Sequence, residues 1–103
     1  MHREKNEYAR EVGMISAIIA MDHGSELYEK FQKHNRGFID LLDEIAQFAE
    51  KFIKKHEKAY SLTGSKDFDW CEYVETTDPR CSCWDDLVLV EAHEYFKELG
   101  YLD

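Results

Sequence analysis

Three cysteines are the residues of this sequence whose types and spacing come nearest to a metal site. Cys81 and Cys83 form a Cys-x-Cys pair, and Cys71 precedes them by ten residues. Three thiolates, with His93 or His56 as a fourth ligand, would suit a zinc ion, which prefers tetrahedral sulfur and nitrogen coordination. However, the sequence contains no Cys-x-x-Cys pair, and free cysteine is often buried as a small apolar residue. We therefore expect ordinary packing with no metal and no cofactor, and zinc binding stays as an alternative.

Acidic pairs near the C-terminus are the second candidate for chemistry. Glu91 and Glu94 are three residues apart and Glu94 and Glu98 are four apart, so the three side chains share one face of a helix. Such carboxylates could hold magnesium or share a proton if other segments enclosed them. The sequence has neither a nucleophile motif nor a glycine-rich phosphate loop. We favour a solvated acidic face without catalysis; a small enzyme or ligand-binding domain with its site near His34 or His56 is a second alternative.

The acidity of the chain is confined to its last third. Residues 67–103 contain eleven acidic and two basic residues, which equals the net charge of −9 for all 103 residues, whereas residues 1–34 sum to −1 and residues 35–66 to +1. Such a segment repels nucleic acid and anionic membranes and attracts basic partners. Aromatic residues among the acids add possible cation–π contacts to lysine and arginine. We predict a partner-binding face made of Asp67, Asp69, Trp70, Glu72, Glu75, Trp84, Asp85, Asp86, Glu91, Glu94 and Glu98.

These observations predict a non-catalytic interaction protein whose acidic C-terminal face docks on a basic surface of another protein. A partner that normally binds nucleic acid is the natural candidate, because carboxylates at helical spacing can occupy phosphate positions. Small acidic inhibitors of phages and mobile elements, such as anti-restriction and anti-CRISPR proteins, have this general character, and the comparison is an analogy without a motif. The odd number of cysteines and the lack of an export signal favour a cytoplasmic protein with reduced thiols.

Helices must position these residues within one mainly α domain. Residues 12–21 are uncharged and apolar on nearly every side, and residues 22–25 are expected to end this helix, with Ser25 as the N-cap of the next. The excess apolar surface of residues 12–21 predicts self-association, most simply as a homodimer with two-fold symmetry.

The strongest periodicity lies between residues 27 and 52. Apolar residues and one histidine alternate between spacings of four and three over this stretch: Leu27, Phe31, His34, Phe38, Leu41, Ile45, Phe48 and Phe52. A 3.5-residue repeat indicates a helix that packs against another helix. We expect one helix over about residues 25–58, because the register passes through residues 35–37. A helix stop at Gly37, with a new helix opening near Asp40, is the alternative.

The rest of the chain is expected to form an acidic C-terminal segment, 61–103, packed across a helical hairpin, 1–60. A loop is predicted from Tyr60 to Asp69. Residues 68–75 alternate weakly between apolar and polar, which indicates a short strand or an irregular segment.

The chain is predicted to turn at Asp78-Pro79 and then to form its last helix. This helix should run from about Trp84 or Asp85 to Leu99, with Gly100 just beyond its end. Residues 101 and 102 are then expected to fold back onto the helix end.

Overall fold

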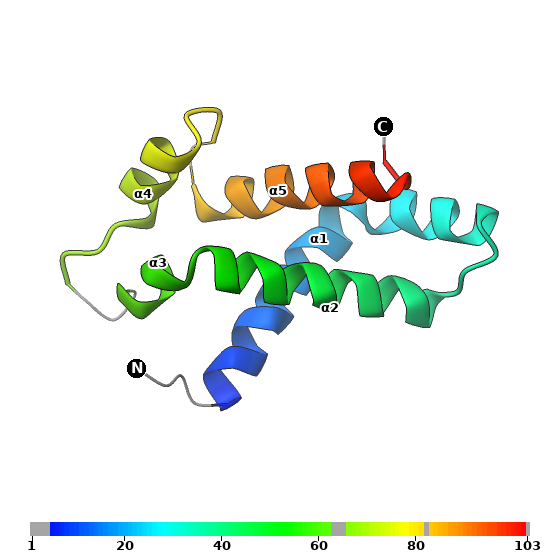
Figure 1. Ribbon diagram of the computed structural model, residues 1–103, viewed down its shortest axis with the longest axis horizontal. Helices are drawn as coiled ribbons and strands as arrows, with labels where there is room; N and C mark the ends of the chain where they lie inside the picture. The colour runs from blue at the N-terminus through cyan, green and yellow to red at the C-terminus, as the bar shows by residue number, and fades with distance from the viewer. Residues whose placement is uncertain (1–4, 63–65, 82, 103) are drawn as a thin grey trace.

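The computed structural model describes residues 5–62, 66–81 and 83–102, and every regular element in these ranges is an α-helix. In Figure 1, α1 and α2 form a hairpin, α5 packs against both, and α4 stands at the end of the molecule opposite the hairpin turn. The predicted mainly α fold, with a helical hairpin and a packed C-terminal helix, is confirmed. In chain order the helices are α1 (Lys5–Lys33), α2 (Phe38–Lys55), α3 (Glu57–Leu62), α4 (Trp70–Thr77) and α5 (Trp84–Leu99).

α1 passes through residues 22–25 without ending, so the predicted break and the N-cap at Ser25 are wrong. Packing on both sides of Gly24 outweighs the roughly 1 kcal/mol that a glycine costs inside a helix. The direction of α1 nevertheless changes between its blue and cyan parts (Figure 1), and a Gly-Ser pair is a common cause of bends. Four fully buried residues, each four or eight positions from the next, carry this packing: Ile15, Ile19, Leu27 and Phe31.

The predicted single helix over residues 25–58 is also wrong, because the chain turns between α1 and α2. Asn35 has a φ of 59°, in the left-handed region. Its N–H donates to the carbonyl of Gln32 at 3.0 Å, and the N–H of Arg36 donates to the carbonyl of Phe31 at 2.8 Å. These two bonds form a Schellman motif, which ends a helix at a left-handed residue. Asparagine is one of the few residues besides glycine that adopts this conformation readily, so the helix ends before Gly37.

The apolar repeat of residues 27–52 is buried on both sides of this turn, but its two members at the turn are exposed. His34 is exposed and Phe38 is 57% exposed. A 3.5-residue repeat is satisfied equally by one helix and by two helices that meet in a hairpin, so it predicted the burial but not the turn. The buried members are Leu27 and Phe31 on α1 and Leu41, Ile45, Phe48 and Phe52 on α2.

α5 has the bounds that were predicted, and its end is a second Schellman motif. Gly100 has a φ of 92°. The N–H of Gly100 donates to the carbonyl of Lys97 at 3.0 Å, and that of Tyr101 to the carbonyl of Phe96 at 2.9 Å. Tyr101 and Leu102 are buried, so the predicted return of the chain onto the helix end is confirmed.

α4 occupies the place of the predicted short strand or irregular segment. The Asp69 carboxylate caps its first turn by accepting a hydrogen bond from the N–H of Cys71 at 2.9 Å. Val74, on the inner face of this helix, is fully buried. α3 carries the helical chain to Leu62, so the predicted loop begins later than Tyr60. Residues 63–65 of this loop lie outside the described residues. The turn at Asp78-Pro79 is confirmed by a bond from the N–H of Arg80 to the Asp78 carboxylate.

Candidate functional site

The densest part of the predicted acidic face is the segment 67–86, which we call the acidic corner. It comprises α4, its flanking loops and the first turn of α5, and it contains seven acidic residues against one basic residue, Arg80. α4 lies at one end of the α2 and α5 pair in Figure 1, and most of its residues are exposed to solvent. Asp86 is half-buried. The exposed carboxylates of the corner are Asp67, Asp69, Glu72, Glu75 and Asp85.

Two tryptophans hold the acidic corner against the rest of the molecule. Trp70 on α4 and Trp84 on α5 have ring centroids 6.2 Å apart, and both are half-buried against the core. The Trp84 indole N–H donates to the Tyr60 hydroxyl at 3.1 Å, which ties α5 to α3. The tryptophans therefore hold α4 and the start of α5, with their carboxylates, against the core. A direct role of either ring in partner binding stays a prediction.

Arg80 restrains the loop between α4 and α5. Its guanidinium donates two hydrogen bonds to the Asp78 carboxylate, at 2.9 and 2.7 Å, and one to Glu94 at 3.3 Å. The two bonds to Asp78, together with the bond from the Arg80 N–H, lower the pKa of Asp78 to about 2. Glu94, one of the residues predicted to bind a partner, is exposed and also contacts Arg80. The net charge of the corner therefore rests mainly on α4 and the start of α5.

Glu91 is also turned inward, into a partly buried polar network between α2, α4 and α5. One carboxylate oxygen lies 2.7 Å from His56 Nε2, and the other accepts a hydrogen bond from the Lys55 ammonium at 3.0 Å. Burial disfavours the charged carboxylate, but the bonds from His56 and Lys55 outweigh that effect, so the pKa of Glu91 is lowered. Glu91 thus stabilises the fold and is removed from the acidic surface.

His56 connects three helices in this network. Its ring is 2% exposed, and Nδ1 lies 2.6 Å from the Tyr73 hydroxyl, so both ring nitrogens have partners. A ring with both nitrogens occupied and almost no exposed surface has no free position for a substrate or a metal ion. The hypothesis of an enzyme centred on His56 therefore gains no support from this geometry, while His34 is exposed at the hairpin turn.

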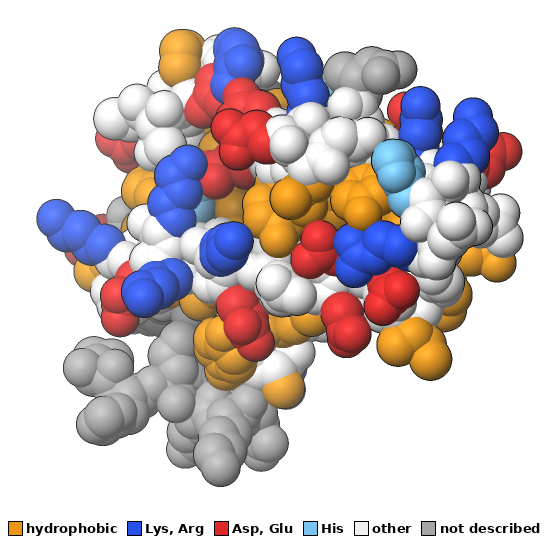
Figure 2. All heavy atoms as spheres, turned by 45° about the vertical axis from the view of Figure 1, so that its right-hand side comes forward, with side chains coloured by type: hydrophobic (Ala, Val, Ile, Leu, Met, Phe, Trp, Pro, Cys, Tyr) orange, Lys and Arg blue, Asp and Glu red, His pale blue; other side chains and the backbone are white. Residues whose placement is uncertain are grey.

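A shallow groove of about 220 Å³ runs between α2 and α5 beside this network. One wall carries Lys51 and Lys55 and the other carries acidic side chains of α5, so the two signs face each other. Figure 2 shows basic and acidic side chains interspersed around an apolar patch on the face turned towards the viewer. This face therefore lacks the single sign of charge that the acidic corner has. The groove is lined by Phe48, Lys51, Phe52, Lys55, Glu91, Glu94, Tyr95 and Glu98.

The cysteines lie at different depths. Cys71 is exposed on α4, Cys83 is half-buried, and Cys81 is buried, where burial and the nearby Asp78 and Asp86 carboxylates raise the pKa of its thiol. Within residues 5–62, 66–81 and 83–102, no three His, Cys, Asp or Glu side chains are grouped as metal ligands. His93, the other proposed ligand, has its ring 6.2 Å from that of His23 on α1.

No protein-family model, curated protein sequence or solved structure matches this chain. None of the helices in the described part combines the length and hydropathy that crossing a membrane requires. Inference about function therefore depends on the geometry and charge of the surfaces described above.

Proposed function

We propose that this protein is a non-catalytic binding module whose acidic corner docks on a basic surface of another protein. The observation that carries this proposal is the placement of seven acidic residues against one basic residue on α4, its flanking loops and the first turn of α5, at one end of the molecule. Clustered charge of one sign accelerates association with a surface of opposite sign and gives the binding a steep salt dependence.

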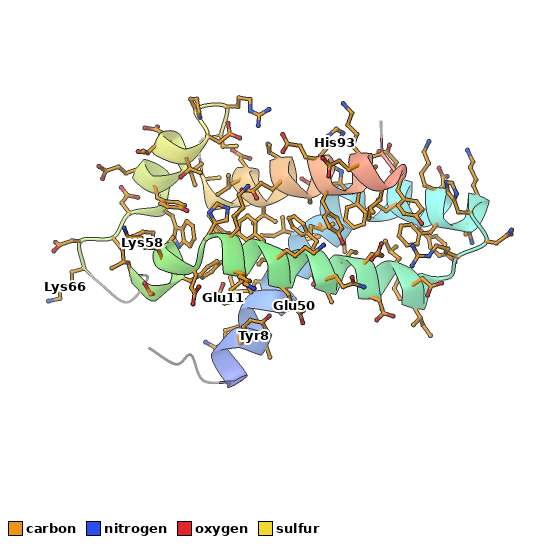
Figure 3. The ribbon with its side chains drawn as sticks, in the orientation of Figure 1. Tyr8, Glu11, Glu50, Lys58, Lys66 and His93 are labelled. Carbon is orange, nitrogen blue, oxygen red and sulfur yellow. The ribbon has the colours of Figure 1, made fainter. Side chains whose placement is uncertain are left out.

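The corner combines exposed charge with a rigid base. Its carboxylates Glu72 and Glu75 are exposed on α4, while the same helix is fixed from the inside by Val74 and by the Trp70–Trp84 contact. A preorganised surface loses little conformational freedom on binding, which favours affinity. Lys66 and Lys58, labelled in Figure 3, lie at the α3 end of the molecule beside this corner. Because they are basic, the surface that contacts a basic partner would end at these two residues.

A basic groove that normally holds nucleic acid is the kind of surface we infer for the partner. Carboxylates at helical spacing can take the positions of phosphates, so the protein would act as a nucleic-acid mimic and an inhibitor. In this case a nucleic acid that the partner binds should compete with the protein for one site. Binding that persists unchanged at saturating nucleic acid would exclude mimicry while leaving acidic docking intact.

The test of acidic docking uses two matched double variants of the full chain. Glu72→Lys with Glu75→Lys reverses two exposed charges of α4, and Glu26→Lys with Glu29→Lys reverses two exposed charges at the same spacing on α1. The partner is captured from an extract of the cells that encode the protein, then purified and titrated by calorimetry. We expect the α4 variant to lose at least tenfold in affinity and the α1 variant to keep it; equal affinities for both would refute the proposal.

A further inference from the structure

One face of α1 is left uncovered by the rest of the molecule although it carries no charge over about three turns, from Met14 to Gly24. Met14 is 46% exposed and Met21 is 84% exposed, and the alanine between them, Ala17, is exposed as well. With Gly24, which is half-buried, these residues follow spacings of three, four and three, the spacing of a helix–helix seam. The opposite face of the same helix carries Ile15 and Ile19, which are fully buried, so α1 has one seam inside the fold and a second one outside it.

Glycine at position 24 is not explained by packing within the chain. A Cβ atom placed there would meet only the Cβ of Ala20, at 3.8 Å, which is an ordinary contact. The backbone of Gly24 has no positive φ, so an alanine would fit and would favour the helix by about 1 kcal/mol. Small residues inside an exposed helix are useful where another helix approaches closely. The outer seam therefore has the form of a contact surface.

We propose that two copies of this chain pair through the outer seam of α1, in antiparallel orientation about a two-fold axis. The charge distribution favours a second copy over another partner. Residues 1–66 have no net charge, whereas residues 67–103 carry −9, so the α1 face is where two molecules of this protein repel each other least. A basic partner would instead be drawn to the acidic corner, and an uncharged seam offers it no complementary charge.

The seam is complementary to itself in one antiparallel register. When residue numbers that face each other sum to 38, Met14 lies opposite the partner's Gly24, and Ala17 lies opposite the partner's Met21. Each methionine thus meets a residue with little or no side chain, as knobs meet holes between packed helices. This pairing leaves the acidic corner of both copies free, and it is independent of the function proposed above.

The first test is the mass of the protein in solution. Sedimentation and light scattering of the full chain over roughly 1–100 µM should show a rise from the chain mass of 12.2 kDa to twice that value. Met21→Glu should stay at the chain mass. At concentrations where the wild type is also monomeric, the variant should have the same melting temperature, because the Met21 side chain is outside the core. Gln47→Glu adds the same charge at an exposed position of α2 and should dimerise like the wild type. A wild type that stays monomeric, or a Met21→Glu or Gln47→Glu variant that behaves otherwise, would overturn the proposal.

A second test fixes the register. Two chains are mixed, one with Ala17→Cys and the other, carrying an affinity tag, with Met21→Cys, both with Cys71 and Cys83 replaced by serine. A disulfide requires Cα atoms within about 4.4–6.8 Å, so the antiparallel register predicts crosslinking of position 17 to position 21 of the other chain. The Ala17→Cys chain alone should crosslink at least several-fold less. Preferential crosslinking of Ala17→Cys to itself would indicate a parallel pairing and overturn the register.

Discussion

Phe31 and Tyr101 stack face to face with their ring centroids 4.1 Å apart, although 70 residues separate them in the chain. Each lies in a Schellman motif, Phe31 at the end of α1 and Tyr101 at the end of α5. Arg36, from the first motif, donates a hydrogen bond to the Tyr101 hydroxyl at 2.8 Å and lies over the Phe31 ring at 4.9 Å. The ends of the two helices therefore dock on each other and close the hairpin against α5.

Tyr101→Ala should lower the free energy of unfolding by about 3 kcal/mol, because it removes a buried ring from the contact between α1 and α5. Tyr101→Phe keeps the ring and loses only the hydroxyl that Arg36 binds, so most of this stability should remain. Urea unfolding followed by circular dichroism measures both variants. A loss for Tyr101→Phe as large as that for Tyr101→Ala would show that the hydrogen bond, and not the stacking, holds the two ends together.

The two helix ends also show how far the sequence can predict this fold. Gly100 was predicted correctly to lie just beyond the end of the last helix, because glycine follows an apolar helix there with no competing signal. At Asn35 the same motif was missed, because the apolar repeat runs through it and Gly37, two residues later, was the more obvious candidate. The periodicity indicates which residues are buried. It does not indicate where one helix ends and the next begins, because a hairpin of two helices can have the same apolar repeat as one long helix.

Gly100→Ala should destabilise the protein by about 1–2 kcal/mol, since the φ of 92° is unfavourable for a residue with a side chain. Gly13→Ala is the matched control: this glycine lies inside α1 with no atom near the position of a new Cβ. Its replacement should raise stability by up to about 1 kcal/mol, because glycine loses more conformational freedom on folding than alanine does. Thermal unfolding of the two variants should therefore shift in opposite directions.

The acidic surface was only partly predictable for a different reason. Spacing along α5 placed Glu91 and Glu94 on the same face as Glu98, and this is correct for an isolated helix. The partners that turn Glu91 inward are His56 and Lys55 from the end of α2, and they are more than 30 residues away in the sequence. No local pattern contains such a contact. Tyr73, the other partner of His56, was missed for the same reason, since α4 was not recognised as a helix.

Glu91→Ala should cost about 1–3 kcal/mol at neutral pH, because His56 Nε2 would lose its partner inside the protein. Since folding lowers the pKa of Glu91, its carboxylate adds stability above the ordinary glutamate pKa of about 4.3, and this stability is lost as the pH falls through the folded-state value. The difference between wild type and Glu91→Gln should therefore shrink on going from pH 7 to roughly pH 3. Urea titrations at both pH values test this, with Val88→Ala as the control, because this fully buried side chain has no titratable group.

The thiols provide a prediction that separates packing from metal binding. Cys71 is exposed and should react with a thiol reagent in the native protein, whereas Cys81 is buried with a raised pKa and should react only after unfolding. Cys81→Ser should cost about 1–2 kcal/mol by placing a hydroxyl in the core, and Cys71→Ser should be close to neutral. Elemental analysis of protein purified without a chelator should find well below one zinc per chain. Stoichiometric zinc, with protection of both cysteines and unfolding on chelation, would instead establish a metal site, because structural zinc sites couple binding to folding.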